Sequence, residues 1–213
     1  MPAVSWPRMP ASSAAARADG GSGAGVGRLA AARHRLALAA HWIARGGLVA
    51  YPTEAVYGLG CDPRDGVAVR RLLALKGRSE DKGLIVIGAD WAQIEPFVLN
   101  LDPERMAAIR STWPGPVTWL LPARRETPRW ITGDHATLAV RVTAHPLAAA
   151  LCRRWGGPLV STSANRAARV PARSALDVRR ALGSGLDYVF TGSCGGGARP
   201  SSIRDGATGA VLR

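Results

Sequence analysis

The chain has 213 residues, 47% of them hydrophobic and 20% charged, a composition expected of one globular domain with a sizeable core. A formal net charge of +13 indicates an anionic partner, either nucleic acid or a phosphorylated metabolite, unless the excess arginine only solvates the surface. The cysteines Cys61, Cys152 and Cys194 form no Cys-x-x-Cys pair, which argues against a disulfide framework or a zinc site and predicts a cytoplasmic protein. The longest apolar run near the N-terminus is too short to span a bilayer, so we expect no membrane association.

Residues 1–27 are rich in Ala, Gly, Ser and Pro and contain too little apolar surface to form a core. We expect them to be a disordered tail ahead of one domain spanning residues 28–213. The glycines of this tail do not predict a dinucleotide-binding loop, because no strand precedes them and their spacing is wrong.

Beyond the tail, the hydrophobic pattern alternates between the periods of helices and strands. Helical patterns occupy residues 29–47, 65–78, 145–157 and 174–183, and two more helices are expected across 89–112. Strand patterns occupy residues 48–53, 84–88, 117–122, 137–142, 158–163, 187–190, 201–205 and 209–213. This alternation predicts an α/β fold in which helices flank a twisted, partly mixed sheet.

Both lysines of the chain lie close together, in the segment "LLALKGRSEDKGLIVIG". A single cation at a helix C-terminus is explained by the helix dipole. Lys76, Arg78 and Lys82 together are harder to explain in that way, and we expect them on a loop outside the core, facing one anion. Lysine supplies a compact point charge and arginine a planar fork, so the two residue types are not interchangeable at such a site.

The segment "PLVSTSAN" brings three hydroxyl side chains and an amide into the loop that follows a strand. An ordinary Ser/Asn turn is the alternative explanation. Ser79 and Lys82 match S-x-x-K, and Ser163 and Asn165 match S-x-N, a combination that resembles penicillin-binding enzymes. We reject a serine nucleophile, because the segment after Ser79 is strand-like and no Lys-Thr-Gly element exists.

Two further features indicate a ligand site. In "YPTEAVYGLGCDP", Thr53 offers a hydroxyl at a strand end, and Gly58 and Gly60 in the following loop allow close backbone approach, although Thr-Glu could also cap a helical turn. Arg141 lies inside an apolar strand, so it requires a carboxylate from the protein or from a ligand. The glycine-rich segment before Ser201 has little weight by itself. The four histidines lack metal-ligand spacing, and we assign none of them to catalysis.

Six segments in order resemble the YrdC/TsaC family of threonylcarbamoyl-AMP synthases in its short bacterial form: "YPTEAVYGLGCDP", "LKGRSEDKGLIVI", "WPGPVTWLLP", "TLAVRVTAHP", "PLVSTSAN" and "PSSIRD". The resemblance covers roughly residues 30–213. It implies a twisted open sheet around a deep, positively charged cavity, and an enzyme that joins L-threonine, bicarbonate and ATP into threonylcarbamoyladenylate and pyrophosphate. A separate transferase complex would then modify the adenosine beside the tRNA anticodon.

The resemblance also implies roles for individual residues. The Lys-x-Arg and Ser-x-Asn tetrad of the family, expected to be catalytic, falls on Lys76, Arg78, Ser163 and Asn165. ATP contacts fall on Lys76, Arg78, Lys82, Thr137, Ser163 and Arg213. Threonine contacts fall on Thr53, Arg141, Ser161 and Ser201. No dedicated metal cage is evident, so Mg²⁺ is expected to arrive with ATP, and no organic cofactor is expected.

Two other functions remain open from the residues alone. The basic surface could bind structured RNA or tRNA without chemistry, although no RRM, KH or zinc pattern supports this. A carbamoyl-transfer role, as in the YrdC-like domain of HypF proteins, would require the acylphosphatase and zinc segments of a much longer chain, which are absent here.

Overall fold

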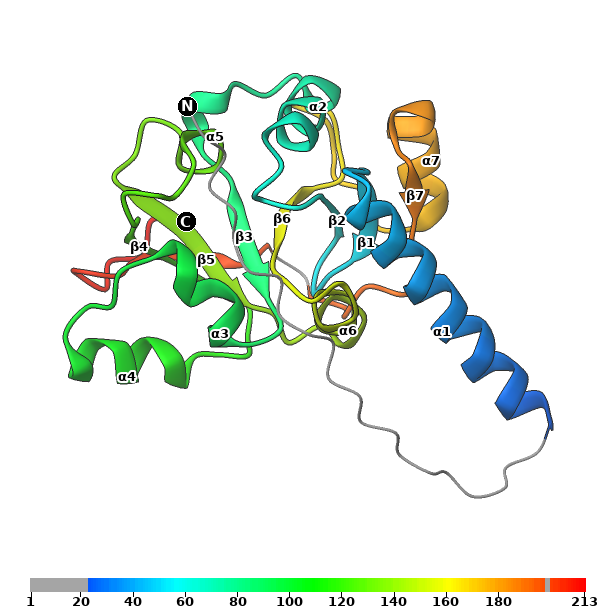
Figure 1. Ribbon diagram of the computed structural model, residues 1–213, viewed down its shortest axis with the longest axis horizontal. Coiled ribbons are helices and arrows are strands. Elements are labelled where there is room, and N and C mark those ends of the chain that lie inside the picture. The colour runs from blue at the N-terminus through cyan, green and yellow to red at the C-terminus, as the bar shows by residue number, and fades with distance from the viewer. Residues whose placement is uncertain (1–22, 198–199) are drawn as a thin grey trace.

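The computed structural model describes residues 23–197 and 200–213, with side chains described from residue 30 on. Helix α1 (Gly23–Ala44) begins inside the segment that we expected to be a disordered tail, and residues 1–22 of that segment lie outside the described residues. Figure 1 shows a sheet with helices on both sides and α1 projecting away from it at its N-terminal end.

A mixed sheet of eight strands forms the centre of the domain, which confirms the predicted α/β fold with a partly mixed sheet. Its strands lie in the order β7-β1-β2-β6-β3-β5-β4-β8. Their bounds are β1 (Val49–Pro52), β2 (Tyr57–Gly60), β3 (Ile85–Gly88), β4 (Val117–Pro122), β5 (Thr137–Val142), β6 (Leu159–Ser163), β7 (Tyr188–Val189) and β8 (Ser202–Asp205). The pairs β1–β7, β3–β5 and β4–β8 are parallel, and the other pairs are antiparallel.

The helices begin and end at residues that favour helix termini. Asp65 caps α2 (Gly66–Lys76) by accepting from two main-chain N–H groups, and Gly77 ends it in the left-handed conformation. His145 caps α6 (Pro146–Trp155), within the helical pattern predicted at residues 145–157. The remaining helices are α3 (Trp91–Ile94), α4 (Pro103–Ser111), α5 (Arg129–Thr132) and α7 (Ala175–Leu182), with 3₁₀ turns η1 (Glu80–Lys82), η2 (Glu95–Phe97) and η3 (Gly183–Gly185).

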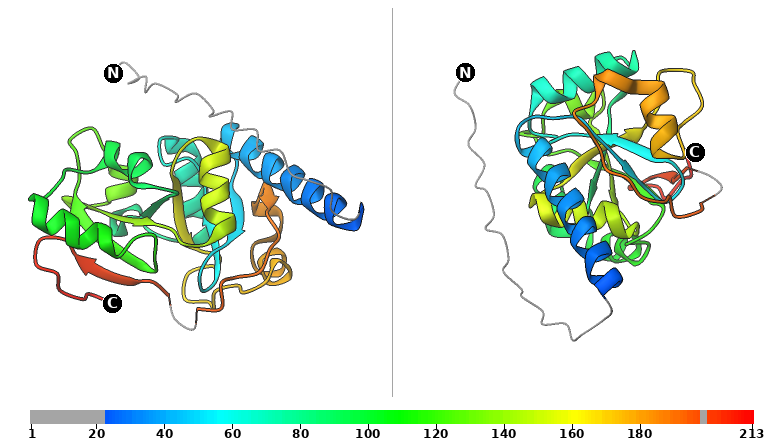
Figure 2. Two further views of the ribbon diagram at one scale, coloured as in Figure 1. Left: turned by 90° about the horizontal axis from the view of Figure 1, so that it is seen from below. Right: turned by 90° about the vertical axis from the view of Figure 1, so that its right-hand side faces the viewer.

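The two faces of the sheet are buried unequally. Alternate residues such as Leu138 and Val140 face the larger core, which also contains side chains from α2, α4, α5 and α7. On the opposite face Ile87 and Leu159 pack against α1 and α6 in a smaller core. Figure 2 shows α1 and α6 side by side on that face. Because these two helices cover only part of it, the rest is left for a cavity.

Three local predictions were incomplete or wrong. The segment containing Gly58 and Gly60, expected to be a loop, is the buried strand β2. A Cβ on Gly60 would lie 2.1 Å from the main-chain oxygen of Val160, so glycine lets β2 approach β6 closely. Helix α5 was not predicted at all. The expected strand at 209–213 forms only an isolated bridge between Val211 and Arg204.

Candidate active site

A cavity of about 1100 Å³ lies on the face of the sheet that α1 and α6 leave uncovered. It collects most of the residues that the sequence predicted for the site, from segments more than 150 positions apart. Those that line it are Thr53, Arg78, Lys82, Thr137, Arg141, Ser161, Ser163, Ser201 and Arg213.

The pleat of the sheet explains why these side chains share one face. Successive side chains of a strand point to opposite faces, so residues two apart point the same way. Thr137 and Arg141 therefore lie on the same face of β5, as Ser161 and Ser163 do on β6. The strand register places these residues of β5 and β6 at similar heights in the sheet. Ile85 of β3 pairs with Ser161 of β6 on one side and with a residue of β5 on the other.

Lys76 does not lie on a loop as expected: it is the last residue of α2 and is only 5% exposed. Its ammonium lies behind the cavity lining. It donates to the main-chain oxygens of Ser163 and Asn165, at 2.8 Å for Asn165, and weakly to the Asn165 amide oxygen at 3.5 Å. Burial, and to a smaller extent the charge of nearby Arg78, lower the pKa of Lys76 to about 8. Lys76 thus fixes the turn that follows β6.

Asn165 completes this turn without lining the cavity. Its amide nitrogen donates to the main-chain oxygens of Arg166 and Arg169, at 2.9 and 2.6 Å. Its amide oxygen accepts from the Ser163 hydroxyl at 2.5 Å. Because that bond uses the only hydroxyl proton of Ser163, this side chain faces the cavity as an acceptor. The four residues of the predicted tetrad therefore lie close together, with Lys76 and Asn165 behind the two that line the cavity.

Besides Arg141, the cations Arg78, Lys82 and Arg213 line the cavity. Arg78 donates to the main-chain oxygens of Lys82 and Gly83, at 3.3 and 2.9 Å, which fixes its guanidinium beside the wall. Burial lowers the pKa of Arg78, and the neighbouring guanidinium of Arg213 lowers it further. Lys82 is exposed at the end of η1. Such a group of like charges is stabilised when a polyanion lies among them.

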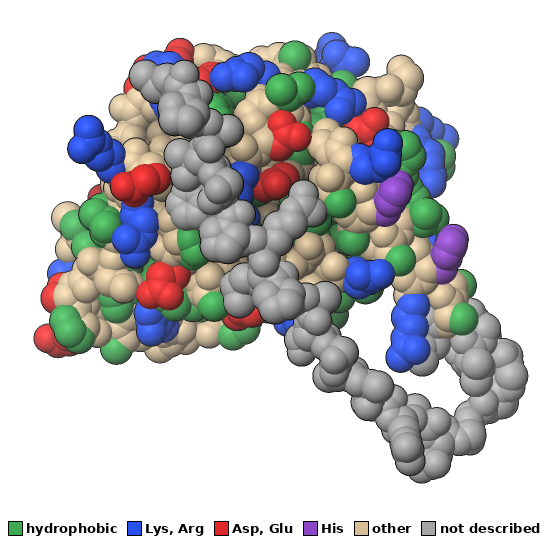
Figure 3. Space-filling model, in the orientation of Figure 1, with side chains coloured by type: hydrophobic (Ala, Val, Ile, Leu, Met, Phe, Trp, Pro, Cys, Tyr) green, Lys and Arg blue, Asp and Glu red, His purple; other side chains and the backbone are tan. Residues whose placement is uncertain are grey.

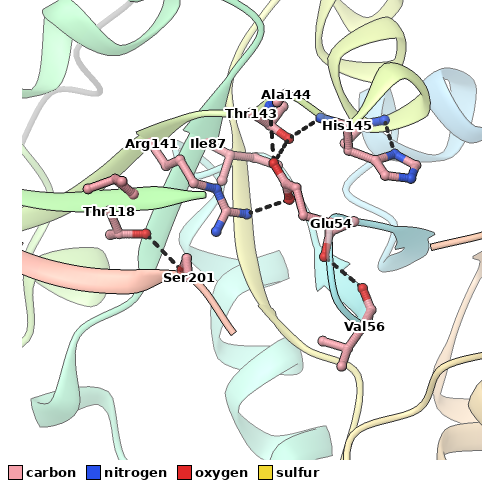
Figure 4. A network of polar contacts seen from close by, with 12 residues as sticks. Glu54, Val56, Ile87, Thr118, Arg141, Thr143, Ala144, His145 and Ser201 are labelled. Carbon is pink, nitrogen blue, oxygen red and sulfur yellow. Dashed lines mark hydrogen bonds and ion pairs between the residues drawn. The ribbon is translucent and has the colours of Figure 1, made fainter. Parts of the chain in front are cut away.

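Arg141 has the internal carboxylate that its buried position required. Its side chain is 8% exposed, and its Nη2 lies 3.4 Å from Oε2 of Glu54 on the turn between β1 and β2. Glu54 Oε1 accepts from the Thr143 hydroxyl at 2.8 Å and from the Ala144 N–H at 3.1 Å. Burial raises the pKa of Glu54, but Arg141 and these hydrogen bonds together lower it below its ordinary value. Figure 4 shows this network.

The hydroxyls at this end of the cavity are already held in place. The Thr53 hydroxyl donates to the main-chain oxygen of Val56 at 2.7 Å, which closes the β1–β2 turn. Ser201, just before β8, shares a hydrogen bond of 3.0 Å with the buried Thr118 of β4. In Figure 4 the guanidinium of Arg141 lies between Glu54 and the Thr118–Ser201 pair.

Sequence reasoning missed Glu54 and Thr118. Glu54 was interpreted only as part of a helix cap, although the expectation that Arg141 needs a carboxylate pointed to a search for one. Thr118 gave no signal, because a threonine within a strand is ordinary. His135 also lines the cavity, and nothing in its sequence context indicated this.

In the view of Figure 3, Lys and Arg side chains are scattered among acidic and apolar ones. Within residues 23–197 and 200–213, no cluster of three His, Cys, Asp or Glu side chains could hold a metal ion. None of the helices in those ranges has the length and hydropathy that a bilayer span requires.

The fold and the site define an α/β protein whose central sheet carries a cavity lined by cations and hydroxyls. A family model described as "Telomere recombination" (Sua5_yciO_yrdC) matches residues 41–213. The chain belongs to this Sua5/YciO/YrdC family, in agreement with the resemblance found in its sequence.

Individual relatives extend this finding. The threonylcarbamoyl-AMP synthase of Nitrosococcus oceani is 58% identical over 84% of this chain and 97% of its own length. That of Halorhodospira halophila is 56% identical over 84% and 94%. The structure of Sua5 from P. abyssi complexed with L-threonine is 35% identical with a TM-score of 0.76, and the match covers 80% of this chain and 50% of the Sua5 chain. The chain is therefore an enzyme of nucleotidyltransferase type.

Proposed function

We propose that the chain forms L-threonylcarbamoyladenylate and pyrophosphate from L-threonine, bicarbonate and ATP. The observation that carries the proposal is that both kinds of binding group line the same cavity. These are cations that could bind a triphosphate and a buried guanidinium that could bind a carboxylate. The names of the relatives and the threonine bound to P. abyssi Sua5 support the same reaction.

The triphosphate would lie among Arg78, Lys82 and Arg213. ATP brings about four negative charges, which offset the repulsion between these cations. Mg²⁺ would enter with ATP as part of the substrate, since such ions keep several waters and are held largely by phosphates. Thr137, on the same wall as Arg141, is expected to contact the nucleotide.

The amino acid would bind at the other end of the cavity, where Arg141 can donate hydrogen bonds to its carboxylate. A buried guanidinium has five N–H donors in a planar fork, which suits a carboxylate better than an ammonium would. The hydroxyls of Thr53, Ser161 and Ser201 would surround the rest of the molecule. Since the Thr53 hydroxyl already donates to Val56, it would act toward the substrate as an acceptor.

The chemistry requires no nucleophile from the protein. The threonine amine attacks bicarbonate and water leaves, which gives a carbamate. A carbamate oxygen then attacks the α-phosphorus of ATP, and the bond from that phosphorus to the bridging oxygen breaks to release pyrophosphate. Positioning and electrostatic stabilisation carry the rate, so Arg78 and Lys82 would stabilise the charge that develops on the leaving pyrophosphate.

The rigid turn after β6 would set the distance between the two substrates. Ser163 faces the cavity, and Lys76 and Asn165 hold it from behind. A separate transferase complex would then use the adenylate to modify the adenosine beside the tRNA anticodon, which implies a cytoplasmic enzyme that can meet tRNA.

Incubation with ATP, Mg²⁺, labelled bicarbonate and a panel of amino acids tests the proposal. Pyrophosphate release should require both bicarbonate and threonine, and the label should appear in an adenylate. Salt-sensitive RNA binding without turnover would support the non-catalytic alternative instead.

A further inference from the structure

Glu54 connects the β1–β2 turn to the end of β5, although three strands of the sheet separate β1 from β5. Through its carboxylate it contacts Arg141, Thr143 and Ala144. Through its main-chain oxygen it accepts from Gly197 at 2.8 Å. The side chain and the main chain of Glu54 therefore make separate contacts, and the side chain can be changed without removing the backbone contact.

Glu54 and Arg141 form an ion pair in which some of the hydrogen-bonding atoms have no partner. Glu54 Oε2 and Arg141 Nε are both buried without a hydrogen-bond partner among the described residues. Removing one member of a buried pair leaves the other charge uncompensated, so Glu54 holds the Arg141 guanidinium in place before any ligand binds. Oε1 is fixed by two donors, and the carboxylate therefore cannot rotate freely.

We propose that Glu54 is a positioning residue for the amino-acid substrate, holding the Arg141 guanidinium from one side so that its opposite side receives the substrate carboxylate. This inference rests on the proposed function and describes how the amino-acid subsite of that function is built. On the opposite side the guanidinium faces the Thr118–Ser201 hydrogen bond across the cavity wall (Figure 4). Preorganisation of this kind raises affinity by lowering the cost of ordering the binding group.

The variant Glu54→Gln tests this contact with little change in shape. Its amide oxygen can still accept from Thr143 and Ala144, and the backbone contact with Gly197 remains. Its amide nitrogen would face Arg141 as a second donor, so that no acceptor holds the guanidinium. Glu104→Gln is the matched control, because Glu104 is exposed on α4 and does not line the cavity.

Binding of L-threonine and of L-threoninamide, measured by calorimetry on the full chain, gives a readout that does not depend on turnover. In Glu54→Gln the Kd for threonine should rise about 30-fold, whereas the Kd for ATP should stay within about twofold of wild type. The preference for threonine over threoninamide should fall by a similar factor, since only a carboxylate uses Arg141. Glu54→Asp keeps the charge on a shorter side chain and should give an intermediate threonine Kd.

A double variant separates positioning from a general structural role. If Glu54 acts through Arg141, adding Glu54→Gln to Arg141→Gln should weaken threonine binding no further. An unchanged threonine Kd in Glu54→Gln, an equal loss for threonine and threoninamide, or full additivity in the double variant would overturn the inference. Should Glu54→Gln fail to fold, Glu54→Asp decides the matter. This variant should bind threonine with an intermediate Kd and should prefer threonine over threoninamide less strongly than wild type does. A wild-type chain that binds threonine but forms no adenylate would refute the proposed function alone, and one that does not bind threonine would refute both.

Discussion

The ammonium of Lys76 lies 2.8 Å from the main-chain oxygen of Asn165, although the two residues are 89 positions apart in the chain. The same ammonium contacts the main-chain oxygen of Ser163. A compact group with three donors can reach several acceptors converging on one point, which a planar guanidinium cannot do. This geometry explains why a chain that uses arginine for nearly all of its positive charges has a lysine here.

Lysine-to-arginine exchanges at the two lysines should therefore differ sharply. Lys76→Arg places a larger, planar group in a buried site 5% exposed, so it should lower the free energy of unfolding by about 1–3 kcal/mol and turnover about 100-fold. Lys82→Arg changes an exposed side chain and should reduce turnover less than about fivefold. Chemical denaturation and pyrophosphate release measure the two effects. Equal losses in both variants would contradict the role assigned to the Lys76 contacts.

The pH dependence of stability should carry the signature of Lys76. Its pKa in the folded protein is about 8, below the ordinary value of 10.5, so between these two pH values the unfolded chain binds more protons at this residue. The cost of burying the ammonium is thus fully present below about pH 8 and is relieved as pH rises toward 10.5. Relative to Lys76→Met, wild type should gain stability over this window, while turnover that needs the ammonium should fall. A flat difference between the two unfolding curves would rule this out.

Much of the fold could be predicted because its elements have clear signals. β4 and β5 were predicted with their observed bounds, since each is an apolar run between turn residues. β2 was missed because two of its four residues are glycine, and only the packed structure shows that Gly60 serves the approach to β6. Sequence patterns that predict strands depend on side chains, whereas β2 depends on close contact between backbones.

The site was predicted in part for a similar reason. Arg141 could be recognised as a charge that needs a partner, because the apolar sequence of its strand indicates that the strand is buried. The identity of that partner could not be read, since Glu54 reaches Arg141 only through the three-dimensional course of the β1–β2 turn. In the same way the burial of Lys76 depends on the turn after β6, which lies far away in the sequence.

The neighbouring guanidiniums of Arg78 and Arg213 predict opposite effects with and without nucleotide. Arg213→Gln removes a charge that lowers the pKa of Arg78, so the ligand-free protein should be unchanged or slightly more stable. The KM for ATP should rise about tenfold, and the rise in Tm on adding ATP should shrink correspondingly. Arg125→Gln, at an exposed residue outside the cavity lining, is the control and should change neither quantity. An ATP-induced Tm shift equal to that of wild type would exclude Arg213 from the nucleotide site.

Removal of the N-terminal segment should leave the enzyme intact. Among the described side chains of α1, the buried ones are Ala39, Ala40 and Ile43, which pack against α6 near the end of the helix. Deleting residues 1–27 removes none of these, so turnover should stay within about twofold of wild type and the free energy of unfolding within about 0.5 kcal/mol. Ile43→Ala, by contrast, opens a cavity at a side chain 1% exposed and should cost about 2–5 kcal/mol. A large loss of turnover on deletion would show that the segment contributes to the working domain through contacts other than this packing.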